Sequence, residues 1–491
     1  MNLSLLIIFP LLTAIGILFC AELKQVRNVS LSAAVIQLGL ALFLLSQYLQ
    51  QHTHGSPDMM FQFTYSWFRP LNINYHVGVD GISIAMILLT ACIVIAGVLV
   101  SWTTEKLSKE FFFLLMLLSV GAYGFFISLD LFTLFFFLEI AVIPKFLLIG
   151  IWGSGKKEYS AMKLALMLMG GSALVFVGLA GIYVNTHTFD IVQIAQTPIP
   201  LAVQKFFFPF AFIGFGVFTA LFPFHTWVPD GHSSAPTAAS MFLAGISMKL
   251  GGYGCLRVAT YLMPDAAHAY SWVIILLATI AIIYGAFATM MQTDLKYINA
   301  YSSVSHCGFV LLGIGMLTKT SINGAVLQMV SHGLMTALFF AAIGMIYSRT
   351  HTRLVAQLGG LLKVTPFIST VFVIAGLCSL GLPGLSGFVA EMTVFIGAWQ
   401  NPDKWYRLAT ILASASIVVT AVYILRATGK TIMGPLSGYY ETLTDARWNE
   451  KLAAVILISG IVIIGVAPFL ITQLIVPATD EIMNKVLGAV K

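Results

Sequence analysis

Charged side chains lie inside long apolar stretches of this sequence. Glu139 lies in FTLFFFLEIAVIP, Lys249 in LAGISMKLGGYG and Glu391 in GLPGLSGFVAE. An isolated charge in such surroundings costs roughly 3 kcal/mol or more unless it faces a polar interior or a partner. Burial also disfavours the charged form, which eases exchange between the charged and neutral states. We therefore predict that these three residues carry protons.

Lys145 lies six positions after Glu139 and directly after Pro144. On an ideal helix it would point about 120° away from Glu139. It also lies close enough to the expected helix end for its long side chain to reach the headgroup region. The sequence leaves open whether Lys145 belongs to a functional site or only extends towards the membrane surface.

Four histidines accompany these charges. His225 and His232 lie in LFPFHTWVPDGH, His306 in SSVSHCGF and His332 in QMVSHGLM. A buried histidine is usually a satisfied hydrogen-bonding group. Four of them near buried charges favour stations of a proton wire, because imidazole titrates near neutral pH. No HxxxH or HxxE spacing accompanies them, so we predict no metal site.

The composition places these residues in a lipid-embedded protein. Of 491 residues, 59% are apolar and 9% are charged, whereas a soluble domain is about 25% charged. Residues 3–20 lack a basic start and a cleavage site, and we expect a retained helix there. The five cysteines have no CxxC pair and read as small buried hydrophobes. The net charge of +6 is spread over many loops, which argues against nucleic-acid binding.

A spanning helix needs roughly 20 apolar residues. The sequence predicts an all-α polytopic protein with about 14 spans, and the twelfth is too long for one straight helix. Gly381, Pro383 and Gly387 predict an interruption there. Asp294 and Lys296 lie at a helix end, where we expect a capping or interface role. The predicted spans are 3–20, 29–48, 80–101, 111–128, 131–151, 162–184, 205–227, 236–262, 272–291, 296–316, 320–347, 364–399, 407–427 and 452–474.

The order of these spans indicates two inverted five-helix repeats with broken helices seven and twelve. We expect four units: an N-terminal three-helix segment (1–110), a first repeat (111–262), a second repeat (263–430) and a C-terminal helix with a tail (431–491). Most basic loop residues follow odd-numbered helices, so those loops are predicted to face the cytoplasm. Both termini would then lie on the outer (periplasmic) side of a bacterial inner membrane.

Three stretches carry a family resemblance: HTWVPDGHSSAPTAASMFLAGISMKLGGYG, QTDLKYINAYSSVSHCGFV and LQMVSHG. They resemble the antiporter-like membrane subunits of respiratory complex I (NADH:quinone oxidoreductase) and of Mrp-type antiporters. The resemblance implies a fourteen-helix fold with a proton path along its central axis. Glu139, Lys249, His332 and Glu391 match the functional positions of the family. A glutamate at 391 is typical of the subunit M type, which corresponds to mitochondrial subunit 4, whereas related subunits carry lysine.

One position departs from the family pattern. Family members usually have a lysine twelve residues before the aspartate of the HxWLPDAH block, and this sequence has Phe218 there. The usual glutamate–lysine pair between helices five and seven cannot form with Phe218. Lys145 is an additional lysine on helix five, and we hypothesise that it supplies the missing cation.

The resemblance implies a proton-translocating subunit of a complex I-type enzyme. The chain contains no phosphate-binding glycine loop and no dinucleotide fingerprint, so we expect no redox site in it. FMN, iron–sulfur clusters and quinone are implied in partner subunits, which include related membrane-arm subunits and a peripheral NADH-oxidising arm. The alternatives are an Mrp-type sodium/proton antiporter, a membrane-bound hydrogenase arm and a passive scaffold. In a scaffold, replacing Glu139, Lys249 or Glu391 would leave activity intact.

Overall fold

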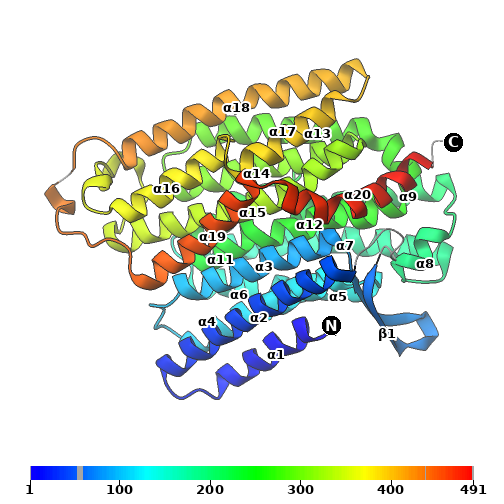
Figure 1. Cartoon of the computed structure of the whole chain (residues 1–491), viewed down its shortest axis with the longest axis horizontal. Helices are drawn as coiled ribbons and strands as arrows, with labels where there is room; N and C mark the ends of the chain where they lie inside the picture. Colours follow the sequence, from blue (N-terminus) through cyan, green and yellow to red (C-terminus); the bar gives the residue numbers. More distant parts are fainter. Residues whose placement is uncertain (1, 52–58, 437, 489–491) are drawn as a thin grey trace.

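The computed structural model of this chain describes residues 2–51, 59–436 and 438–488. Its helices run side by side along one axis, and the two ends of the bundle differ (Figure 1). A two-stranded hairpin and the short helix α8 (Ile191–Gln196) mark one end, which we call the hairpin end. The first and last described residues lie there too. Long connections, including residues 432–436 and 438–447, lie at the opposite end, which we call the loop end.

The described chain is almost entirely helical, as expected. Its first half contains α1 (Leu5–Leu18), α2 (Leu23–Gln51), α3 (Gly81–Val100), α4 (Ser108–Ile127), α5 (Leu131–Ile140), α6 (Val142–Trp152), α7 (Lys157–Thr186), α8 (Ile191–Gln196), α9 (Leu201–Phe218), α10 (Trp227–Ser234), α11 (Thr237–Phe242), the π-helical η2 (Leu243–Ser247), α12 (Met248–Gly254) and the π-helical η3 (Cys255–Thr260). Its second half contains α13 (Pro264–Met290), α14 (Leu295–Gly315), α15 (Lys319–Thr350), α16 (Pro366–Ser379), α17 (Ser386–Trp399), α18 (Lys404–Thr431), α19 (Trp448–Val466) and α20 (Phe469–Gly488).

Within the described residues, 10 helical segments are long and apolar enough to cross a membrane. The predicted polytopic all-α fold is confirmed. The count of fourteen spans stays a prediction, because α1, α16 and α17 are shorter and the run from α11 to η3 is interrupted by π-helical turns. Helix α15 is the central element, since its apolar window is entirely buried by its neighbours.

The two predicted helix breaks are present. Helix α9 ends at Phe218, and the chain turns before α10 begins at Trp227. Helix α16 ends at Ser379, and α17 begins at Ser386. Pro223 and Pro383 fall inside these turns, where a missing backbone N–H prevents the helix from continuing. The predicted C-terminal tail is wrong for the described residues, because the chain continues after Pro468 as the 20-residue helix α20.

A local motif shows that the two repeats are inverted. Helices α7 and α15 both end in Thr-His-Thr, with His187 and His351 in the left-handed conformation. Just after each motif, a backbone carbonyl accepts a hydrogen bond from the first residue of another helix. In the first repeat Leu131 N, at the start of α5, donates to Phe189 O (2.8 Å). In the second, Leu295 N, at the start of α14, donates to Arg353 O (3.0 Å). The first copy lies at the hairpin end and the second at the loop end, as inversion requires.

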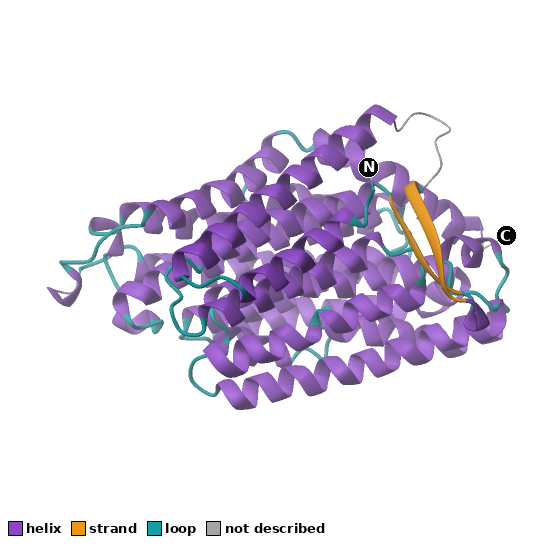
Figure 2. Ribbon diagram, turned by 90° about the horizontal axis from the view of Figure 1, so that it is seen from below, coloured by secondary structure: helices purple, strands orange, loops and turns teal. Residues whose placement is uncertain are grey.

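The segment before α3 differs from the polar loop that the sequence suggested. Residues Met60–Phe68 (β1) and Ile73–Val79 (β2) form an antiparallel hairpin, drawn in orange in Figure 2. The stretch FQFTYSWF alternates aromatic and polar residues, which is the pattern of a half-exposed strand. The all-α description therefore holds for the bundle but not for this described connection.

Candidate functional site

Lys249 lies at the centre of the bundle, between two π-helical turns. Wide turns of this kind are frequent at functional sites. Its ammonium contacts the carbonyl oxygen of Ala244 at 2.6 Å and Nδ1 of His332, on α15, at 2.8 Å. Lys249 and His332 are each only 1% exposed. The contact joins the first repeat to the second.

A second set of contacts continues from His332 into the second repeat. The rings of His332 and His306 are stacked, with centroids 5.4 Å apart. Nδ1 of His306 lies 3.3 Å from Oε1 of Glu391, and its Nε2 lies 3.0 Å from Oγ of Ser379. Gln328 of α15 also approaches Nδ1 of His306, at 3.3 Å. The structure therefore brings Lys249, His332, His306 and Glu391 together in one buried series.

The break between α16 and α17 makes room for the Glu391 carboxylate. Gly381 lies in this break with φ +74°, a conformation that other residues rarely adopt. A Cβ atom on Gly381 would lie 2.8 Å from Oε2 of Glu391. The missing side chain thus lets the carboxylate approach the turn closely.

The first repeat places its charges differently. Helix α5 ends at Ile140 and α6 begins at Val142, so Glu139 and Lys145 do not share one ideal helix. Lys145 is 1% exposed, and its ammonium lies 5.8 Å from the ring centroid of Phe218. Lys145 therefore points into the protein rather than towards the membrane surface.

Glu139 is half-buried and interacts electrostatically with Lys145. In the described structure, neither the Lys145 ammonium nor Oε1 of Glu139 has a hydrogen-bond partner. An ammonium held in a cation–π position without a carboxylate contact is a costly arrangement. The protonation states of Glu139 and Lys145 can therefore respond strongly to a change in nearby charge.

The two histidines of the HTWVPDGH block lie apart from each other. His232 is fully buried and stacks on Phe340, with centroids 5.2 Å apart. Among the described residues, neither of its ring nitrogens has a hydrogen-bond partner. His225 lies in the α9–α10 turn between Phe222 and Tyr284, with ring centroids 5.5 Å and 4.8 Å away. His232 interacts with the charge of Lys249, whereas His225 does not join the buried series.

The sequence did not single out Lys296 as buried. Asp294 does cap α14, by accepting a hydrogen bond from the backbone N–H of Lys296 at 2.7 Å. The Lys296 side chain, however, is only 4% exposed, and its ammonium donates to Ala235 O at 2.6 Å. No local signal reveals this burial, because Ala235 comes from a distant part of the chain.

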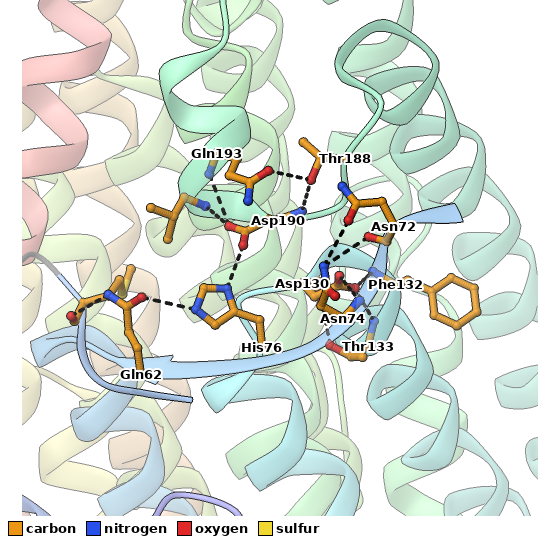
Figure 3. Close-up of polar contacts among 12 residues, drawn as sticks. Gln62, Asn72, Asn74, His76, Asp130, Phe132, Thr133, Thr188, Asp190 and Gln193 are labelled. Carbon is orange, nitrogen blue, oxygen red and sulfur yellow. Dashed lines mark hydrogen bonds and ion pairs between the residues drawn. The ribbon is translucent and has the colours of Figure 1, made fainter. Parts of the chain in front are cut away.

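A polar cluster at the hairpin end was also missed (Figure 3). His76 of β2 contacts Asp190, with Nδ1 2.9 Å from Oδ2. Asp130 accepts a hydrogen bond from the backbone N–H of Asn74 at 3.0 Å and caps α5. The hairpin is thus attached to the starts of α5 and α8.

Burial affects the two carboxyls of this cluster differently. Burial raises the pKa of Asp130 to about 6, against the opposing effect of its backbone hydrogen bonds. Burial also acts to raise the pKa of Asp190, but the hydrogen bond and charge of His76 outweigh it, and the Asp190 pKa lies below its ordinary value. We infer a structural role for the cluster, because its carboxylates cap helices and hold the hairpin.

The central arrangement suits proton transfer between side chains. Lysine, imidazole and carboxyl groups follow one another in the series, and not every one of them is held in one charge state by an oppositely charged partner. Protons can therefore shift along the series. No group of three or more His, Cys, Asp or Glu side chains in the described ranges is arranged to hold a metal ion. The fold and these contacts define a polytopic membrane protein with a buried line of titratable groups.

Comparisons with known proteins agree with this class. The family described as NADH:quinone oxidoreductase/Mrp antiporter, transmembrane, matches residues 128–417. The chain is 37% identical to NAD(P)H-quinone oxidoreductase chain 4-2 of Synechocystis sp., over 86% of this chain and 76% of that protein. It is 33% identical to NADH-quinone oxidoreductase subunit M of Rickettsia bellii, over 98% of both chains. Its fold matches a chain of respiratory complex I from Thermus thermophilus with a TM-score of 0.90, at 24% identity over 99% of both chains.

This chain belongs to the NADH:quinone oxidoreductase/Mrp antiporter membrane family. The matched range begins just before α5 and ends within α18, so it contains the whole buried series. The resemblance first seen in three short stretches is thereby confirmed.

Proposed function

We propose that this chain is a proton-translocating subunit in the membrane arm of a bacterial NADH:quinone oxidoreductase. The observation that carries the proposal is the buried series Lys249, His332, His306 and Glu391, which crosses from the first repeat into the second. The relatives named above are NAD(P)H-quinone or NADH-quinone oxidoreductase chains, which favours this function over a sodium/proton antiporter.

The chemistry of the chain is proton movement alone. A charge that arrives near Glu139 changes its interaction with Lys145, and at low effective dielectric such a change is felt strongly at Lys249. Lys249 then passes a proton to His332, and His306 relays it to Glu391. Redox groups such as FMN, iron–sulfur clusters and quinone belong to partner subunits in this proposal, and their chemistry supplies the driving force.

In this proposal the loop end faces the cytoplasm and the hairpin end faces outward, because most basic loop residues follow odd-numbered helices. The described chain ends both lie at the hairpin end, in keeping with outward-facing termini (Figure 1). The partners in this proposal are related membrane-arm subunits and a peripheral NADH-oxidising arm.

Inverted membrane vesicles from a strain with and without this chain test the function. With NADH as donor, we expect quinone-linked acidification of the vesicles only when the chain is present, and equal acidification with and without sodium. Sodium-dependent proton exchange that needs no NADH would instead identify an antiporter. Full NADH-driven acidification without the chain would refute the proposal.

A further inference from the structure

A buried ion pair joins the helix that carries Lys249 to the start of α3. Arg257, in the π-helical turn η3, pairs through its Nη2 with Oδ2 of Asp80. Both side chains are only 1% exposed. Asp80 also caps α3, by accepting a hydrogen bond from the backbone N–H of Ser83 at 2.8 Å. A buried ion pair is by itself weak evidence for stability, so its position calls for another explanation.

A second contact between the same two elements lies one turn closer to Lys249. The hydroxyl oxygen of Tyr253 lies 3.0 Å from Oγ of Ser83. Tyr253 and Arg257 follow Lys249 by four and eight positions, so all three lie near one side of the helix. The guanidinium of Arg257 also lies 5.8 Å from the ring centroid of Tyr253. We call these two contacts the α3 clamp: Asp80 with Arg257, and Ser83 with Tyr253.

The opposite side of α12 packs closely on α9 but carries glycines. A Cβ atom on Gly251 would overlap the carbonyl oxygen of Phe215, and one on Gly254 would overlap the Phe215 ring. The two glycines therefore let the helices approach closely, and they present no side chain that could interlock. The rotation of α12 about its own axis is thus fixed chiefly by side chains on the clamped side.

This rotation decides whether Lys249 meets His332. The end of a side chain lies about 6 Å from a helix axis, so a rotation of about 20° would move the ammonium by about 2 Å. The present distance of 2.8 Å to Nδ1 of His332 would not survive such a shift as a hydrogen bond. The second partner of the ammonium, Ala244 O at 2.6 Å, belongs to the same helical run and turns with it. It cannot hold Lys249 against α15.

We propose that the α3 clamp positions Lys249 for its contact with His332. Helix α3, which precedes both repeats, thereby maintains the contact through which protons pass from one repeat to the other. Arginine does not release its proton, so Arg257 is a positioning residue and takes no part in the transfer itself. This inference rests on the proposed proton-translocating function.

The simplest alternative is that the clamp only stabilises the fold, and a second ion pair provides the matched control. His76 and Asp190 are also buried at the hairpin end, with Nδ1 2.9 Å from Oδ2, and Asp190 caps α8 as Asp80 caps α3. This pair holds the hairpin and does not touch the helix of Lys249. Asparagine caps a helix about as well as aspartate, so both pairs can be neutralised without loss of the cap.

The test compares Asp80→Asn/Arg257→Met with Asp190→Asn/His76→Ala. Replacing both partners avoids leaving one buried charge alone. NADH-driven proton pumping in vesicles is measured and scaled to the amount of assembled complex. The clamp variant should lose pumping by at least about tenfold, because a misplacement of about 1 Å can cost roughly 100-fold. The control variant should pump normally. Normal pumping by the clamp variant, or equal losses in both variants, would overturn the proposal.

Combining the clamp variant with His332→Ala separates positioning from a general loss of stability. If the clamp acts through the contact between Lys249 and His332, its removal should matter little once His332 is absent. We expect a further loss of less than about twofold in the combined variant. Losses that multiply would show that the clamp acts independently of His332 and would contradict the proposal.

A second variant leaves the ion pair intact and so avoids its effect on folding. Ser83→Ala/Tyr253→Phe removes both hydroxyl groups of the other clamp contact and leaves no polar group unpaired there, which is nearly neutral for stability. Pumping should still fall at least about twofold, the factor that corresponds to the net contribution of one hydrogen bond. Normal pumping in this variant would refute the clamp even if the ion-pair variant does not assemble.

Lys249→Met serves as the reference for the proposed function. If Lys249→Met loses pumping while both clamp variants pump normally, only the clamp is wrong. If Lys249→Met itself pumps normally, the proposed function is wrong.

Discussion

The two repeats share a backbone motif but hold their titratable side chains differently. In the second repeat, His332, His306 and Glu391 form a closed series of contacts. In the first, Glu139 and Lys145 interact without touching, and Lys145 lies against Phe218. Titratable groups in contact favour proton transfer between them. Charges that interact without contact favour a response of their protonation states to a charge that changes elsewhere. In the proposed function, the second repeat would therefore conduct protons and the first would respond to charge.

Substitution of Lys249, which connects the two repeats, should give the largest loss of proton pumping. Lys249→Met removes the ammonium that contacts His332 at 2.8 Å, so the series loses its connection to the first repeat. We expect NADH-driven pumping to fall at least about 100-fold, the lower end of what positioned proton-transfer groups contribute. Vesicle acidification measures this. Normal pumping would contradict the proposed proton route through Lys249.

The glycine at the α16–α17 break tests the second repeat without removing any titratable group. Gly381→Ala places a Cβ atom 2.8 Å from Oε2 of Glu391 and should displace the carboxylate from His306. We expect pumping to fall by about tenfold, equivalent to roughly 1.4 kcal/mol of barrier. Gly384→Ala is the matched control, because its φ of +93° imposes a similar backbone strain but no atom lies within 4 Å. Equal losses in both variants would assign the effect to strain.

Moving the positive charge of Lys145 to position 218 tests whether the first repeat needs a cation near Glu139. Lys145→Met should reduce pumping severalfold, because Glu139 loses its cation. Adding Phe218→Lys to Lys145→Met returns a lysine to the same region, since the Lys145 ammonium lies 5.8 Å from the Phe218 ring centroid. We expect pumping to recover in part, with NADH–quinone electron transfer as the reference. If Phe218→Lys brings no recovery in an assembled complex, the position of the cation matters more than its presence.

The hairpin-end cluster should affect stability more than pumping. A double-mutant cycle of His76→Ala and Asp190→Asn should give a coupling of about 1–2 kcal/mol, typical of a buried charged hydrogen bond. Thermal unfolding of the purified complex at pH 7 measures it. Because the Asp190 pKa is lowered, this stability is fully present above the unfolded value of 3.8 and is lost as the pH falls below it. Additive effects at pH 7 would show that the pair does not stabilise the hairpin.

Much of the fold was readable because it follows from local chemistry. Pro223 and Pro383 predicted the two breaks, since proline cannot continue a helix. The inversion had a local trace as well, because Thr-His-Thr recurs at the ends of α7 and α15. The hairpin was missed although FQFTYSWF alternates as a strand does. The helix α20 was missed because its polar residues, among them Asp480 and Glu481, looked like a tail.

The candidate site was readable only in part. Glu139, Lys249 and Glu391 stood out because charge in an apolar helix is rare. The direction of Lys145 was left open, since it depends on the turn at Ala141 and on Phe218 from another helix. The expected wire of four histidines stays a prediction: His332 and His306 contact each other, whereas His225 contacts Phe222 and Tyr284.

The sequence by itself determined that the chain lies in lipid, where the helices break and that titratable residues lie within apolar helices. These depend on residue type and on neighbours within a few positions. The tertiary structure decided which groups meet: Lys249 with His332, His306 with Glu391, and Lys296 with Ala235. Each of these contacts joins helices that are far apart in the chain. Their distances depend on how whole helices pack, which no local pattern contains.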